Sequence, residues 1–285
     1  MTGAILDPGP LQSLAYWVHD LSPFVFQVGD RFGLRWYSLA YIAGFIVAWL
    51  MLRYYHRRGR SPFDPAQQEF IFIALFLGVL VGGRLGFVLF YDFAGFARDP
   101  LRILRVWEGG MASHGGFIGV FCAIWIIAVR TRVSLWQTGD IICTLAPPGI
   151  LFGRIANFIN GELWGRTSEV SWAVIFPQSA APGTPIDLID PRHPSQLYAA
   201  FLEGLVLLAY TQVRFWRKSP RTPAGQIAGE FLIAYAILRG VGEIFREPDA
   251  PLILGLSRGV FYSLFVAAAG VGVIAVARRS NRIRN

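Results

Sequence analysis

The fold of this chain is decided by a stretch that reads Gly153-Arg154-Ile155-Ala156-Asn157-Phe158-Ile159-Asn160-Gly161-Glu162-Leu163-Trp164-Gly165-Arg166. An apolar run over residues 141–152 leads into it, so an arginine and two asparagines enter the edge of a membrane-spanning segment. An arginine in the hydrocarbon region costs roughly 2.5–3.5 kcal/mol, which makes it a candidate functional residue. On a helix, Arg154, Asn157 and Gly161 share one face. This face suits an anionic, hydrogen-bonding headgroup better than a lipid tail.

The composition indicates an integral membrane protein. Hydrophobic residues make up 54% of the 285 positions and charged residues only 15%, where a soluble domain carries about 25%. The net charge of +8 comes from short basic clusters between apolar runs, which is typical of topology determinants rather than of a nucleic-acid interface. Cys122 and Cys143 lie inside apolar runs without a partner at metal-ligand spacing, so neither a disulfide framework nor a metal site is expected.

The apolar runs predict an all-α polytopic membrane protein with about seven transmembrane helices and a small periplasmic head of loops and short strands. The expected spans cover residues 36–54, 69–90, 114–129, 141–159, 197–213, 227–245 and 259–276. Pro147-Pro148 should kink or break the fourth span. Residues 1–285 are expected to form a single integral membrane domain, in which residues 1–35 are an N-terminal interfacial arm and residues 160–195 are the inserted head.

The basic residues predict the orientation. More Lys and Arg residues lie in the loops after the first, third and fifth spans and in the C-terminal tail than on the opposite side. The positive-inside rule then places the C-terminus in the cytoplasm and the N-terminus, His114 and the head outside. The first thirty residues lack a basic segment and a small-residue cleavage site, so we expect the N-terminus to be retained.

A second polar face lies on the sixth span, where four residues form one stripe down the helix: Tyr235, Arg239, Glu243 and Arg246. Together with Arg154, this face would bring arginines from two helices to one place. Two guanidinium groups that fork onto phosphate oxygens form a stronger anion site than one. The alternative is structural, because Glu243 could simply neutralise Arg239, and Glu162 could neutralise Arg154.

Other candidate residues carry weaker signals. His114 opens the third span before two glycines and could act as a general base near neutral pH, although a histidine at a helix start is more often a cap. His193, before Pro194, is equally ambiguous, and Tyr37 could be an aromatic of the membrane interface. Arg84 lies in a glycine-rich patch that would let a helix or a ligand approach closely, so it either belongs to the site or joins helices.

Several classes of protein are excluded because their sequence motifs are absent. The chain has no motif for a serine nucleophile, a zinc protease or a phosphate-binding P-loop. It offers no obvious covalent nucleophile, so an enzyme would need one from its substrate. Intramembrane arginines would also suit a transporter or flippase for an anionic lipid, or a structural subunit in which they are merely paired. The odd number of spans and the lack of a detectable inverted repeat argue against a transporter.

Several motifs together resemble one known family. They are Gly153-Arg154-x-x-Asn157-Phe158-x-Asn160-x-Glu162, His114-Gly115-Gly116, Arg192-His193-Pro194-Ser195-Gln196-Leu197-Tyr198, Arg239-x-x-x-Glu243-x-x-Arg246-x-Pro248-Asp249 and the Trp36-Tyr37 pair. In this order they are similar to the bacterial phosphatidylglycerol:prolipoprotein diacylglyceryl transferases. The resemblance covers the chain from about Trp36 to Val276 and favours an enzyme over a transporter.

The resemblance implies a multi-pass enzyme of the bacterial inner membrane that moves a diacylglyceryl group from phosphatidylglycerol to the lipobox cysteine of a prolipoprotein signal peptide. It implies membrane lipids as surroundings, no metal, no organic cofactor and no nucleic-acid partner. The implied catalytic residues are His114, Arg154 and Arg239. The implied substrate-binding residues are Tyr37, Gly153, Arg154, Asn157, Asn160, Glu162, His193, Tyr235, Glu243 and Arg246.

Overall fold

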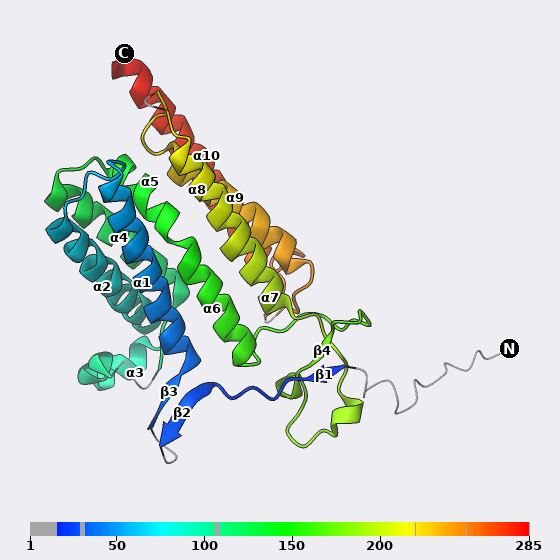
Figure 1. The fold of residues 1–285 in the computed structure, drawn as a ribbon. Coiled ribbons are helices and arrows are strands. Elements are labelled where there is room, and N and C mark those ends of the chain that lie inside the picture. The colour runs from blue at the N-terminus through cyan, green and yellow to red at the C-terminus, as the bar shows by residue number, and fades with distance from the viewer. Residues whose placement is uncertain (1–15, 29–31, 106–108, 220, 249, 285) are drawn as a thin grey trace.

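A bundle of helices forms most of the structure, a computed structural model that describes residues 16–28, 32–105, 109–219, 221–248 and 250–284 (Figure 1). The long helices run side by side, and the strands lie together at one end of the bundle. The helices of the bundle are α1 (Trp36–Arg57), α2 (Pro65–Phe90), α4 (Ser113–Thr131), α5 (Leu135–Leu145), α6 (Pro147–Ile159), α7 (Ser195–Ala199), α8 (Leu207–Trp216), α9 (Gln226–Glu243) and α10 (Arg258–Arg284). A π-helix, η6 (Ala200–Val206), joins α7 to α8.

Five helical segments among the described residues are long and apolar enough to cross a membrane, namely residues 36–57, 65–90, 114–131, 135–159 and 258–280. Two further helical segments lie alongside them in the bundle. The segment over residues 195–216 is divided by η6 into short pieces, and it contains a buried glutamate. Helix α9 carries Glu230, Arg239 and Glu243, which make it less apolar. The polar residues in these two segments therefore set them apart from the five.

The fourth predicted span is interrupted at its two prolines. Helix α5 ends at Leu145 and α6 begins at Pro147, which confirms the predicted break. The helix begins at Leu135 rather than at residue 141, because Ser134 caps it by accepting a hydrogen bond from the amide of Gln137. Ala146 keeps helical backbone angles, so α5 and α6 form one kinked segment, and Arg154 lies in its second part, α6.

Glycines bring α2 and α4 into close contact. A Cβ atom on Gly78 would lie 2.6 Å from the carbonyl oxygen of Gly119, and one on Gly86 would lie 2.6 Å from Cα of Gly115. Any larger residue would push the helices apart. The predicted small-residue patch is therefore a helix-packing surface, and Gly115 of the His-Gly-Gly motif belongs to it.

The N-terminal arm contains strands, although its first fifteen residues lie outside the described part of the chain. Strand β1 (Trp17–Val18) pairs in parallel with β4 (Val174–Ile175), and β2 (Phe24–Val28) pairs antiparallel with β3 (Phe32–Arg35). His19 is buried, and its Nε2 atom donates to the carbonyl oxygen of Phe158 at 2.7 Å. The arm thus packs on the end of α6.

The predicted head consists mainly of loops. Residues 160–195 contain β4 and two short 3₁₀-helices, η4 (Pro177–Ser179) and η5 (Ile186–Leu188). Backbone hydrogen bonds attach the head to the segment after α9 and to the arm: the amide of Arg166 donates to the carbonyl of Phe245, that of Glu247 to Trp164, and that of His19 to Ile175. A short helix α3 (Phe93–Arg98) and the 3₁₀-helix η2 (Pro100–Leu104) lie in the connection between α2 and α4.

A candidate active site around a buried ion-pair network

Three helical segments supply the charges of a buried network. Arg154 comes from α6, Glu203 from η6 and Arg239 from α9. Arg154 donates through Nε and Nη2 to Glu203 Oε2, at 3.2 and 2.7 Å. Arg239 donates through Nη1 to the other carboxylate oxygen, Oε1, at 3.2 Å. One carboxylate therefore joins the two arginines that the sequence expected to converge.

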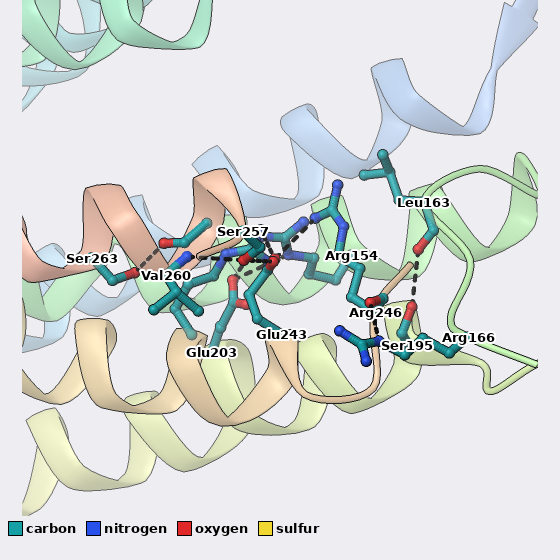
Figure 2. Close-up of polar contacts among 12 residues, drawn as sticks. Arg154, Leu163, Arg166, Ser195, Glu203, Glu243, Arg246, Ser257, Val260 and Ser263 are labelled. Carbon is teal, nitrogen blue, oxygen red and sulfur yellow. Dashed lines mark hydrogen bonds and ion pairs between the residues drawn. The ribbon is translucent and has the colours of Figure 1, made fainter. Parts of the chain in front are cut away.

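A second carboxylate extends the network. Glu243 Oε1 lies 2.5 Å from Nη2 of Arg239 and 3.7 Å from Nη1 of Arg246. Its other oxygen, Oε2, accepts a hydrogen bond from the hydroxyl of Ser257 at 2.6 Å. Figure 2 shows Glu203 and Glu243 beside each other, with Arg154 and Ser257 close to them. Three guanidinium groups and two carboxylates thus alternate through the interior of the bundle, with a net charge of +1 when all are ionised.

The arginines border a small pocket. Its lining mixes cationic, amide, hydroxyl and apolar groups: Arg154, Asn157, Leu163, Ser195, Gln196, Ala199, Arg239, Gly242 and Arg246. The side chains of Ser195 and Gln196 hold the wall in place, because they donate to the backbone carbonyls of Leu163 and Glu162 at 3.0 and 2.7 Å. This lining presents fixed positive charge and hydrogen-bond donors, which are the groups that an anionic ligand requires.

The amide of Asn157 organises a second polar cluster beside the arginines. Its Nδ2 atom donates to the hydroxyl of Tyr37 at 2.9 Å and to Glu162 Oε1 at 2.7 Å. Asn160 also donates to Glu162 Oε1, at 3.4 Å. One half of the structural alternative, the pairing of Glu162 with Arg154, is therefore not what the structure has, because Arg154 pairs with Glu203. The other half of that alternative is confirmed, since Glu243 does pair with Arg239.

The two glycines of the signature have different surroundings. Gly161 adopts φ of +66°, which favours glycine, and a Cβ atom there would lie 2.8 Å from Oε1 of Gln178. A Cβ atom on Gly153 would meet no heavy atom of the described residues within 4 Å. Tyr235 stacks on Phe231 and interacts electrostatically with Arg154 and Glu203.

The two candidate histidines lie apart from the pocket lining. The exposed ring of His114 packs edge-on against Tyr262 of α10, with ring centres 5.0 Å apart. His193 lies among the aromatic rings of Tyr198 and Phe245, and its Nδ1 atom is 3.1 Å from the hydroxyl of Tyr198. Partial burial lowers the pKa of His193 from its ordinary value. The structure thus brings the arginines, Asn157 and their acidic partners together, but not these imidazoles.

The surroundings of Arg84 answer the question left open by the sequence. Its Nε donates to the carbonyl of Ile103, its Nη1 to Gly109 and Gly110, and its Nη2 to Arg102 and Arg105. All five N–H groups of a guanidinium are then used on backbone carbonyls. Arg84 therefore fixes the connection between α2 and α4.

Glu203 is the residue that the sequence analysis missed. Its side chain is fully buried, with 0% exposure. The signal was present, because an ionisable residue inside a predicted apolar span is as costly to bury as Arg154 and is a candidate functional residue for the same reason. Ser257 and Gln196 gave no comparable signal, since small polar residues near helix ends are common.

The helical bundle, with five segments among its described residues long and apolar enough to cross a membrane, defines a membrane protein that holds a buried network of arginines and glutamates. Residues 23–276 match the model of a family described as "Prolipoprotein diacylglyceryl transferase", and the chain belongs to this family.

Its relatives include proteins named phosphatidylglycerol–prolipoprotein diacylglyceryl transferase from several bacteria. The protein from Ruegeria pomeroyi is 43% identical over 283 residues, which cover 91% of this chain and 96% of the relative. That from Rhodospirillum rubrum is 44% identical over 267 residues, covering 91% and 93%. That from Pasteurella multocida is 43% identical over 275 residues, covering 95% and 97%.

Proposed function

We propose that this protein is the membrane transferase that moves the diacylglyceryl group of phosphatidylglycerol to the thiol of the lipobox cysteine in prolipoproteins. The names of its relatives support both substrates. One observation carries the assignment to a site: Arg154 and Arg239 share one buried carboxylate and border one pocket. Their arrangement suits the single negative charge of a phosphodiester, which would bring the net charge of the network to zero.

The reaction forms one bond and breaks one. The thiolate sulfur attacks the glycerol carbon that carries the phosphodiester, so a C–S thioether bond forms while the C–O bond to phosphate breaks. Glycerol phosphate leaves with the bonding electrons, and the proton of the thiol passes to a base or to the leaving group. A free thiol has a pKa near about 8.5, so both thiolate formation and phosphate departure need assistance.

The arginines assist the leaving group. Arg154 and Arg239 hold the phosphate and stabilise the second negative charge that develops as the C–O bond breaks, and Arg246 completes the cationic side of the pocket. Fixed donors of this kind act strongly because they need no rearrangement during the reaction. Glu243 holds Arg239 and Arg246 in place.

The amide cluster and the histidines take supporting roles in this proposal. Asn157, fixed by Tyr37 and Glu162, presents its amide at the pocket wall, and Asn160 supports Glu162. His114 takes the proton of the incoming thiol, and its exposed position leaves it open to a peptide. Gly153 leaves space beside Arg154 for the lipid, Tyr235 lines the approach to the arginines, and His193 contacts the substrate from the head.

We further propose seven membrane spans in the inner membrane, with α7–α8 and α9 as the two additional ones. The N-terminus and residues 160–195 are then periplasmic, and the loop over residues 58–64 and the C-terminus are cytoplasmic. A reporter that works only in the periplasm should be active when inserted in residues 160–195 and inactive in residues 58–64. The reverse pattern would overturn this orientation.

Transfer of labelled diacylglyceryl from phosphatidylglycerol to a lipobox peptide tests the function. Purified wild-type protein in liposomes should form a thioether product, whereas Arg154→Ala and a peptide with serine in place of the lipobox cysteine should give none. If wild type moves phosphatidylglycerol between leaflets and modifies no peptide, the protein is a lipid transporter and the transferase proposal fails.

A further inference from the structure

We infer that Glu203 is a positioning residue of the transfer reaction, which sets the separation and orientation of the two phosphate-binding arginines. This inference rests on the proposed function. Its basis is a carboxylate with 0% exposure whose two oxygens are divided between two guanidinium groups, Oε2 for Arg154 and Oε1 for Arg239. A carboxylate that only balanced one charge would need only one of these partners.

The backbone is adapted to bring this carboxylate to the arginines. Glu203 lies in the π-helix η6, where the amide of Leu207 reaches back to the carbonyl of Leu202. Stretches of π-helix inside α-helices are rare. Those that do occur are frequently found at functional sites. The neighbouring Gly204 lets η6 approach α6, because a Cβ atom there would lie 2.7 Å from Cβ of Leu151, one turn before Arg154. The π-turn and the glycine together put the carboxylate within reach of α6 and α9.

The charge balance gives Glu203 a role beyond holding helices together. Arg154 and Arg239 would repel each other if they shared a buried site without an acid between them. With Glu203 in place, both lie on one carboxylate and still border the pocket. The donors are then already arranged when charge develops on the leaving phosphate, which is the condition for strong transition-state stabilisation.

This role predicts a separation between binding and turnover. Replacing Glu203 by Gln keeps the shape of the side chain but raises the net charge of the network from +1 to +2. Binding of an anionic lipid should therefore not weaken, whereas turnover should fall because the guanidinium groups lose their common acceptor. Loss of folded protein would instead lower the amounts of bound lipid and of product in proportion.

The test compares wild type with three variants in the peptide transfer assay, with phosphatidylglycerol binding and Tm measured on the same samples. For Glu203→Gln we expect kcat to fall about 100-fold while KM for phosphatidylglycerol rises less than about threefold. Glu203→Asp keeps the charge but shortens the side chain, so it should recover part of the activity and remain about tenfold below wild type. The control is Glu230→Gln, which breaks a similar ion pair to Arg214 away from the pocket and should change kcat less than about threefold.

Each outcome decides a separate point. Wild-type kcat in folded Glu203→Gln, or in Glu203→Asp if the glutamine variant does not fold, would overturn the positioning role. Equal losses of kcat and of bound lipid would also overturn it, because they indicate a structural role only. Failure of wild type to modify the peptide would instead overturn the proposed function.

Discussion

Replacing Arg154 by lysine tests the contribution of the guanidinium fork apart from its charge. Arg154 places two nitrogens on Glu203 Oε2, at 3.2 and 2.7 Å. A lysine in this place retains at most one of these bonds and cannot fork onto a phosphate. Each hydrogen bond to a charged group contributes about 1.5–3 kcal/mol. Loss of one bond to Glu203 and one to phosphate should therefore cost at least about 3 kcal/mol, or about a hundredfold in kcat/KM.

The assay is diacylglyceryl transfer to a lipobox peptide under conditions where kcat/KM is measured directly. The matched control is Arg214→Lys, because Arg214 makes a similar two-nitrogen contact with Glu230, at 2.7 and 2.8 Å, and does not line the pocket. Arg214→Lys should stay within about threefold of wild type. The fork has no special role if Arg154→Lys is as active as Arg214→Lys, since the two changes remove the same chemistry from different places.

Three further changes test other features of the structure. Arg84→Lys should lower Tm without lowering transfer per folded molecule, because a lysine offers three donors to five carbonyls; an unchanged Tm would contradict its anchoring role. Gly259→Ala should reduce kcat about tenfold, since the added Cβ atom would lie 2.5 Å from Oε1 of Glu243, whereas Gly272→Ala, where nothing lies within 4 Å, should be neutral; equal activities would argue against the contact. Burial lowers the pKa of His193, so the unfolded state binds more protons and stability should fall as pH drops below about 6.5; a Tm that falls between pH 7.5 and 5.5 as steeply in His193→Gln as in wild type would contradict this.

The sequence predicted those parts of the fold and site that depend on local pattern. Apolar runs located the helices, and helical spacing placed Tyr235, Arg239 and Glu243 on one face of α9. Helix starts were less certain, because they depend on single caps. Asp64 before α2 and Ser134 before α5 cap helices that begin at Pro65 and Leu135, ahead of the predicted starts at residues 69 and 141.

The choice of ion-pair partners could not be predicted from spacing. Glu162 was a reasonable partner for Arg154 only if the helix continued through it. The helix ends at Ile159, and Gly161 turns the chain with a positive φ, so the carboxylate of Glu162 lies against Asn157 instead. The actual partner, Glu203, comes from another helix and reaches Arg154 through a π-turn, and tertiary packing of this kind leaves no periodic signal in the sequence.

The pairing of β1 with β4 also has a consequence for the order of assembly. Trp17 is made early in synthesis, but its partner in the sheet is Val174. At about 5–20 residues per second, a ribosome needs about 8–30 s to make the intervening chain. Strand β1 therefore has no partner strand until α1 to α6 and then β4 have been made. A strand made early is thus fixed only after β4 has been made, and this pairing joins the arm to the head.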